Sequence, residues 1–428
     1  MKRRPFLLHS AGTTLLLTAP VPAAANRPQT AIAITRVYGD GMRLDAVALA
    51  YPQSVSKDRP DSTPYRVIGR HIIAAYPAAT ADGVPADEGR YVILQLDPQD
   101  TDALLVKKQK PTAQQQAKTA GSGPGKAGDI QESAPTLVPA QADIDIGGET
   151  ITTTAVINKT CDDFTQHSYT DRETGKTVRY NLYTPRHPEA GKRYPLVLFM
   201  HDAGVTGSNT KATLYQGNGT IAWAGSAAQA ENPCYVLAPQ FDEIIADDDS
   251  HTSAYLDATL NLIRTLEKEH PIDPARRYAT GQSGGGMMSI AMNVKYPDFF
   301  AASYLVACQW DPAVVAPLAQ SRLWITVSMD DDKAYPGQLA ILEVLARYGA
   351  KIARGEWDAQ WKPGEIAAAF AAMDAEHANI NFVHFAKGSV FKSEAEANAG
   401  GASGHTATWK YAYNIAPIRE WIFRQQKS

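Results

Sequence analysis

The strongest constraint on the fold is the regular alternation of strand-like and helix-like segments from about Phe164 to the C-terminus. Residues 194–200 (YPLVLFM) are almost continuously apolar, as in strands that are covered on both faces. Residues 254–270 have an amphipathic pattern that predicts a helix. Further strand-like and helix-like segments follow in turn, so residues 164–428 are predicted to form a mostly parallel α/β sheet flanked by helices.

The chain before Phe164 has a different pattern. Short runs rich in β-branched and aromatic residues are separated by turn residues such as Gly39-Asp40-Gly41, which predicts a small all-β sandwich over residues 26–163. Residues from about 107 to 143 are rich in Gln, Ala, Gly, Pro and Ser, and are predicted to be a flexible loop of this module.

The first 25 residues resemble an export signal. A basic start is followed by a modest apolar stretch, and Ala23 and Ala25 suit cleavage before Asn26. The apolar stretch is too short to span a bilayer. Arg3 and Arg4 also leave open a twin-arginine route beside the general secretory one. We therefore expect a periplasmic or secreted protein, and the alternative is a basic N-terminus without a targeting role.

Composition excludes several classes of protein. The chain has 428 residues, a formal net charge of −4 and a hydrophobic share of 44%, which indicates neither a nucleic-acid-binding protein nor a disordered chain. Cys161, Cys234 and Cys308 are too few for a disulfide scaffold and lack metal-ligand spacing. One pair could bridge in an oxidising compartment, but we expect all three to be small buried residues.

The motif that carries chemistry is Gly281-Gln282-Ser283-Gly284-Gly285, between a strand-like and a helix-like segment. This G-x-S-x-G pattern is weak alone, but at a strand-to-helix turn it places a strained serine at the tip. Gly281 and Gly285 would let the strand and the helix approach each other. Ser283 is therefore a candidate nucleophile rather than a simple capping residue.

A serine nucleophile needs a base, and the base needs an acid to orient it. After the strand-like residues 322–328 the chain offers Asp330, Asp331 and Asp332, and His405 lies in a later loop just before the last helical region. The order Ser, Asp, His matches the α/β-hydrolase arrangement. His377 and His384 lie near a helix end and inside a strand, so we expect them to be structural.

Two backbone N–H groups are expected to form an oxyanion hole. Gly284 follows the nucleophile, and Ala203 lies in the turn His201-Asp202-Ala203-Gly204 directly after the apolar strand.

These motifs together resemble the α/β-hydrolase superfamily. The chain is similar to exported esterases related to polyhydroxyalkanoate-depolymerase-like and predicted-peptidase proteins, some of which have an N-terminal immunoglobulin-like domain. The segments that carry the resemblance are DRETGKTVRYNLYTP, HDAGVTGSN, IAWAGSAAQAENPCYVLAPQ, GQSGGG, YPDFFAA and GHTATWKYAY. The resemblance implies Ser283 as the nucleophile and His405 as the base. It places the acid on Asp332, four residues before Pro336, with Asp330 as the alternative.

Three features remain open at this point. The family usually has His-Gly where this chain has His201-Asp202, which puts a carboxylate beside the oxyanion loop. Trp357 and Trp361 could wall a substrate site or belong to the core. The acidic residues 242–250 could bind calcium, although a solvated loop is the better interpretation.

The sequence thus predicts an exported serine hydrolase that cleaves small or polymeric carboxylic esters through an acyl-enzyme. A serine peptidase of the same fold and a catalytically inactive binding protein are the alternatives. No metal or organic cofactor, nucleic acid or stable membrane anchor is expected. The N-terminal module is expected to serve domain packing or homo-oligomerisation.

Overall fold

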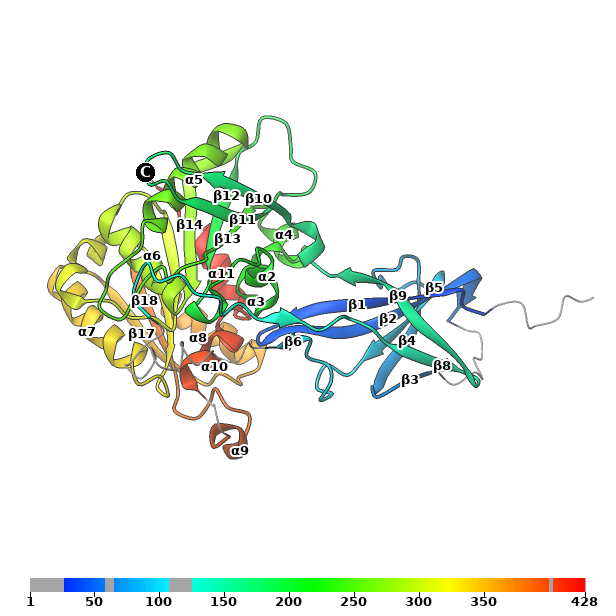
Figure 1. Cartoon of the computed structure of the whole chain (residues 1–428). Coiled ribbons are helices and arrows are strands. Elements are labelled where there is room, and N and C mark those ends of the chain that lie inside the picture. The colour runs from blue at the N-terminus through cyan, green and yellow to red at the C-terminus, as the bar shows by residue number, and fades with distance from the viewer. Residues whose placement is uncertain (1–26, 58–64, 108–124, 400–402, 428) are drawn as a thin grey trace, which may run out of the picture.

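The computed structural model describes residues 27–57, 65–107, 125–399 and 403–427. The predicted export signal, residues 1–25, and its cleavage site lie outside these ranges. Figure 1 shows an elongated β-rich domain at the N-terminal end of the chain and a larger α/β domain beside it. Among the described residues, no helix has the length and apolar character needed to cross a membrane.

The N-terminal domain is built on a seven-stranded sheet with the strand order β3-β8-β9-β1-β2-β5-β4. Side chains of β2 alternate between two buried clusters: Val47 and Leu49 belong to one, Ala46 and Ala48 to the other. The period of two therefore buries both faces of the long β1–β2 hairpin. The strands are β1 (Thr30–Tyr38), β2 (Gly41–Ser56), β3 (Tyr65–Val67), β4 (Ile72–Ala78), β5 (Glu88–Leu96), β8 (Asp143–Ile146) and β9 (Glu149–Asn158), and β6 (Val106–Lys107) pairs with β7 (Thr136–Leu137) in a separate ribbon.

The second sheet has nine strands in the order β10-β11-β13-β12-β14-β15-β16-β18-β17. The pairings β10–β11 and β11–β13 are antiparallel, and every pairing from β13 to β17 in this spatial order is parallel. The predicted α/β-hydrolase architecture is confirmed. The strands are β10 (Thr165–Thr170), β11 (Thr177–Tyr183), β12 (Tyr194–Met200), β13 (Tyr235–Gln240), β14 (Ile272–Gln282), β15 (Ala302–Val306), β16 (Leu323–Ser328), β17 (Ile352–Trp357) and β18 (Ile380–Phe385).

Helices cover both faces of this sheet. On β12, Leu196 and Leu198 face the cluster formed with α5, α6 and α7, whereas Val197 and Phe199 face the cluster that contains residues of α3, α10 and α11. The helices are α2 (Ala212–Tyr215), α3 (Asn218–Ala224), α4 (Ser226–Glu231), α5 (Tyr255–Glu269), α6 (Gly284–Lys295), α7 (Ala334–Arg347), α8 (Pro363–Asp374), α9 (Glu394–Ala397), α10 (Gly404–Ala412) and α11 (Ala416–Phe423).

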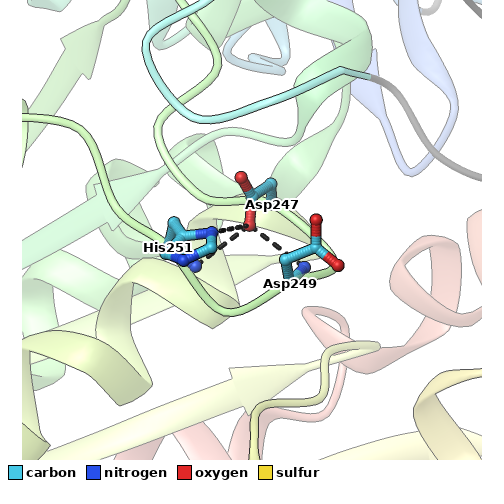
Figure 2. A group of neighbouring side chains, drawn as sticks. All are labelled: Asp247, Asp249 and His251. Carbon is cyan, nitrogen blue, oxygen red and sulfur yellow. Dashed lines mark hydrogen bonds and ion pairs between the residues drawn. The ribbon is translucent and has the colours of Figure 1, made fainter.

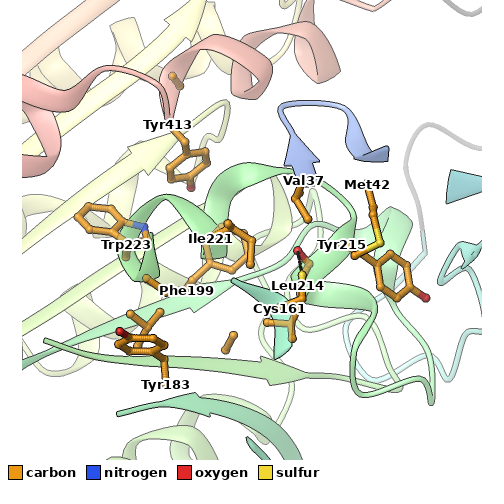
Figure 3. Close-up of a cluster of buried hydrophobic side chains, with 14 of the residues drawn as sticks. Val37, Met42, Cys161, Tyr183, Phe199, Leu214, Tyr215, Ile221, Trp223 and Tyr413 are labelled. Atoms are coloured by element: carbon orange, nitrogen blue, oxygen red, sulfur yellow. Dashed lines mark hydrogen bonds between the residues drawn. The ribbon is translucent and has the colours of Figure 1, made fainter. Parts of the chain in front are cut away.

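The two domains share one hydrophobic cluster. Val37 and Met42, beside the turn of the β1–β2 hairpin, belong to the same buried cluster as Phe199, Tyr215 and Trp223 of the α/β domain (Figure 3). The hairpin is therefore part of the packing of the second domain, and the domains are held together by apolar burial.

Part of the predicted flexible loop is docked on the α/β domain. We call residues 125–135 the strap. Its backbone exchanges hydrogen bonds with the loop after β13: Gly128 N–H donates to the Ile244 carbonyl (2.9 Å) and Ile244 N–H to the Asp129 carbonyl (2.9 Å). Ala134 is buried, and its N–H donates to Thr206. The prediction of a flexible loop over residues 107–143 is therefore wrong for the strap. Backbone hydrogen bonds hold this segment in place, although it has few apolar side chains.

Candidate active site

Ser283 stands at the sharp turn between β14 and α6. Its backbone has φ 51° and ψ −122°, a conformation that is strained for a residue with a side chain. A Cβ at Gly281 would lie 2.4 Å from the carbonyl carbon of Gly285, and one at Gly285 would lie 2.0 Å from the Met200 oxygen. Only glycine fits at both positions, so the strained serine turn predicted from the motif is present.

His405 lies between Ser283 and an aspartate. Its Nε2 is 2.9 Å from Ser283 Oγ, and its Nδ1 is 2.5 Å from Asp331 Oδ2. In the neutral ring Nδ1–H donates to the carboxylate, which leaves Nε2 as the acceptor for the serine hydroxyl. The ring also packs nearly perpendicular to that of Trp409, one helical turn further along α10, at 5.2 Å between ring centroids. The structure thus brings together Ser283, His405 and Asp331.

The expectation that Asp332 orients His405 is wrong, and so is its alternative, Asp330. Asp332 is exposed and lines the pocket in front of the serine. The Asp330 side chain binds Gly388 instead of His405: its Oδ2 accepts a hydrogen bond from Gly388 N–H at 2.7 Å. Asp331 instead points inward, because its Oδ1 accepts from the N–H groups of Lys333 (3.2 Å) and Ala334 (2.9 Å) at the start of α7.

These contacts explain the ionisation of Asp331. Burial opposes its negative charge, but the hydrogen bond and charge of His405 and the two backbone donors outweigh burial, so the pKa of Asp331 is lowered. Asp331 accepts from the N–H groups two and three residues later, as a helix N-cap does, but α7 itself begins at Ala334, so the sequence alone does not separate Asp331 from Asp330 and Asp332.

The two candidate oxyanion donors lie on facing segments. Ala203 begins the short 3-10 turn Ala203–Val205 after β12, and Gly284 is the first residue of α6. A Cβ placed on Gly284 would be 3.8 Å from the Ala203 nitrogen. The N–H of Gly284 belongs to the first turn of a helix, where N–H groups have no partner within the helix.

A cavity of about 640 Å³ opens in front of Ser283. It is also lined by Met287 and Phe391, which supply apolar surface, and by a markedly acidic wall. The charged residues of this wall are Asp247, Asp248, Asp330, Asp331, Asp332 and Lys333. Lys333 forms an ion pair with Asp248 at 2.8 Å. The size is in the range of small-molecule sites.

The loop after β13 forms one wall of this pocket, and Asp247 holds it in shape (Figure 2). Asp247 Oδ1 accepts from the N–H groups of Asp249 and His251, both at 3.0 Å, and Oδ2 accepts from Ala127 N–H of the strap at 2.9 Å. Ligand atoms of Asp247, Asp249 and His251 lie within 4.8 Å of one another, but the Asp247 oxygens already bind backbone N–H groups. Both oxygens of Asp247 therefore stabilise the loop itself.

The remaining residues singled out in the sequence lie elsewhere. Trp357 and Trp361 line a separate cavity of about 490 Å³, together with Phe385 and Tyr411. His384 lies in β18 and packs against Tyr335 of α7, and burial lowers the pKa of His384. Cys161, Cys234 and Cys308 are buried and free, as expected.

Comparisons with known proteins agree with this architecture. The family model "Esterase Ig-like N-terminal domain" matches residues 30–144, and the model "Putative esterase" matches residues 172–377. A crystal structure of a thermostable esterase has a TM-score of 0.72 and 21% identity, and covers 93% of this chain and 100% of its own, which shows a shared fold.

Two curated relatives match over shorter stretches. "Putative esterase NocK" of Nocardia uniformis subsp. tsuyamanensis is 31% identical over 33% of this chain and 42% of its own length. "Probable feruloyl esterase C" of Aspergillus terreus is 30% identical over 26% of this chain and 40% of its own length. The chain thus matches about two fifths of the length of these relatives. The matches and the fold together identify an immunoglobulin-like domain of the esterase type followed by an α/β-hydrolase domain of the esterase family.

Proposed function

We propose that this chain hydrolyses carboxylic esters with Ser283 as nucleophile, His405 as general base and Asp331 as the acid that orients His405. The observation that carries the proposal is the continuous hydrogen-bonded row from Asp331 Oδ2 through His405 to Ser283 Oγ. The esterase names of the matching family model and relatives support the ester as the bond that is cleaved.

The reaction follows from this geometry. Ser283 Oγ attacks the ester carbonyl carbon while His405 Nε2 takes the hydroxyl proton, and the N–H groups of Ala203 and Gly284 stabilise the tetrahedral oxyanion. When this tetrahedral intermediate collapses, the bond between the carbonyl carbon and the alcohol oxygen breaks, and the alcohol receives the proton from His405. Water, deprotonated by the same ring, then attacks the acyl-enzyme and releases the carboxylic acid and Ser283. Asp331 stays ionised and stabilises the histidinium in both steps.

An assay of short p-nitrophenyl esters beside a panel of peptides tests the type of bond. We expect ester hydrolysis in the wild type, none above background in Ser283→Ala, and wild-type activity in Ser226→Ala, which removes an exposed serine of α4. Cleavage of peptides without esters would select the peptidase alternative. Absence of fluorophosphonate labelling at Ser283 would favour an inactive binding protein.

We further propose export of the chain and self-association through its N-terminal domain. The basic and apolar residues 1–25, with Ala23 and Ala25 before Asn26, support export. Self-association would use the exposed apolar side chains of the N-terminal domain, Ile68 (48%), Ile73 (58%) and Val84 (57%). A mature N-terminus at Met1 would contradict export, and a monomer by light scattering would contradict self-association.

A further inference from the structure

Asp202 caps the turn that presents one of the proposed oxyanion donors. It precedes the 3-10 turn Ala203–Val205, and its Oδ1 accepts a hydrogen bond from Gly204 N–H at 2.9 Å. The carboxylate therefore fixes the backbone on the C-terminal side of the Ala203 amide.

The other oxygen of the same carboxylate binds the nucleophile turn. Asp202 Oδ2 accepts from the side-chain amide of Gln282 at 2.9 Å, and Gln282 is buried directly before Ser283. One side chain thus connects the segment that contains the Ala203 N–H with the segment that contains the Gly284 N–H. The two donors can act on one oxyanion only if these segments keep a fixed distance.

His201 anchors the same turn from the opposite side. Phe241 N–H donates to His201 Nε2 at 3.0 Å, so Nδ1 carries the proton and donates to the Asp202 carbonyl at 2.8 Å. Burial lowers the pKa of His201, which keeps the ring neutral and this tautomer in place. Both the backbone and the side chain of Asp202 are therefore held.

A carboxylate this close to the hole does not itself stabilise an oxyanion, because like charges repel. Its benefit must come from geometry. We propose that Asp202 and Gln282 form a positioning pair, which sets the oxyanion hole by locking the Ala203 turn to the Ser283 turn; this inference rests on the proposed ester hydrolysis. A glycine at position 202 could form neither bond.

Variants of Asp202 and Gln282 distinguish an effect of the hydrogen bonds that position the oxyanion hole from an effect of the Asp202 charge. Asp202→Ala removes both bonds and is expected to lower kcat about 10- to 100-fold with KM within about threefold, because displaced donors weaken transition-state binding. Gln282→Met removes the donor and should lower kcat about tenfold, and the double variant should lose little more than Asp202→Ala alone. Asp202→Asn can keep the Gly204 bond and donate to a rotated Gln282 amide, so kcat should stay within about threefold of the wild type.

Phenylboronic acid gives a readout that a merely structural role would not change. It forms a tetrahedral adduct with the nucleophilic serine, so its Ki should rise in Asp202→Ala and Gln282→Met by about the factor lost in kcat. Gln229→Met is the matched control: it removes a side-chain amide of α4 that donates to the carbonyls of Trp223 and Cys234, and Ki and kcat should not change. Circular dichroism checks that each variant is folded.

Two results would overturn the pair. One is an unchanged kcat and boronate Ki in Gln282→Met, and the other is an equal loss in Asp202→Asn and Asp202→Ala, which would assign the effect to charge. The wild type and Ser283→Ala in the same assay test ester hydrolysis separately. If the wild type fails there, the proposed function fails; if only the variants behave otherwise, the positioning pair fails.

Discussion

The turn of the N-terminal hairpin touches the helix that carries His405: a Cβ placed on Gly39 would lie only 2.5 Å from the carbonyl oxygen of Lys410. Both His405 and Lys410 belong to α10, so a displacement at one is transmitted along a rigid helix to the other. The N-terminal domain therefore contacts the helix that carries His405 as well as packing against the rest of the α/β domain.

Gly39→Ala is expected to lower kcat about three- to tenfold, because the added methyl group must push the hairpin or α10 aside. Steady-state kinetics and a thermal unfolding midpoint measure the effect. Gly364→Ala is the matched control, since a Cβ there meets nothing within 4 Å and lies in α8. Equal kcat values for Gly39→Ala and the wild type would show that the contact does not reach His405.

The acidic wall of the pocket predicts charge selectivity. Asp332 is exposed on this wall, whereas the Asp248 carboxylate is paired with Lys333. We expect Asp332→Asn to raise kcat/KM for an ester with an anionic acyl group about two- to fivefold relative to a neutral ester of similar size. Competition between the two esters at low salt measures the ratio. A ratio that is the same in both proteins would mean that Asp332 does not act on the substrate.

Asp247→Asn removes the hydrogen bond between the strap and the pocket loop and leaves the other hydrogen bonds of this side chain in place. The asparagine oxygen can still accept from Asp249 and His251, but its amide nitrogen cannot accept from Ala127 N–H. We expect a loss of about 1 to 2 kcal/mol in stability and faster proteolysis within residues 125–134. Asp145→Asn serves as the control, because its Oδ1 accepts from Gly148 within the N-terminal domain. Equal cleavage rates at the strap in both variants would refute the link.

His201 predicts a pH dependence of stability. Its pKa in the folded protein is lowered by burial, so below the ordinary histidine value of about 6.5 the unfolded chain binds a proton that the folded chain does not. The stability contributed by the neutral ring is complete above about pH 6.5 and falls by roughly 1 kcal/mol for each pH unit below it.

His201→Gln keeps an acceptor for Phe241 N–H but has no titrating ring. Thermal unfolding of both proteins between pH 7 and 5 should therefore show their difference in stability shrinking as the pH falls. A constant difference across this range would mean that His201 is not held neutral by the fold.

The sequence predicted the layers of the α/β domain and two of the three hydrogen-bonded side chains. The apolar residues 194–200, the serine turn and the late His405 each have a strong local pattern. Asp331 was missed because three adjacent aspartates follow one strand, and a resemblance in spacing to Pro336 does not reveal which carboxylate points inward. That choice is made by the backbone donors of Lys333 and Ala334, which exist only once α7 has formed.

The strap was missed for a similar reason. The composition of a segment indicates how much apolar area it can bury, but not which backbone groups it can pair with. Residues 125–135 are held by backbone hydrogen bonds to Ile244 and Thr206, which are far away in the sequence. The role of Asp202 was likewise open, because its partner Gln282 lies 80 residues further along the chain.

Hydrolysis of p-nitrophenyl acetate by Ser283→Ala, Asp331→Asn and Asp332→Asn, beside the wild type, tests the central claim most directly. We expect Ser283→Ala to be inactive, Asp331→Asn to lose about 10³- to 10⁴-fold in kcat because His405 loses its orienting charge, and Asp332→Asn to stay within about threefold. A loss in Asp332→Asn as large as that in Asp331→Asn, or an active Ser283→Ala, would contradict the assignment of Ser283, His405 and Asp331.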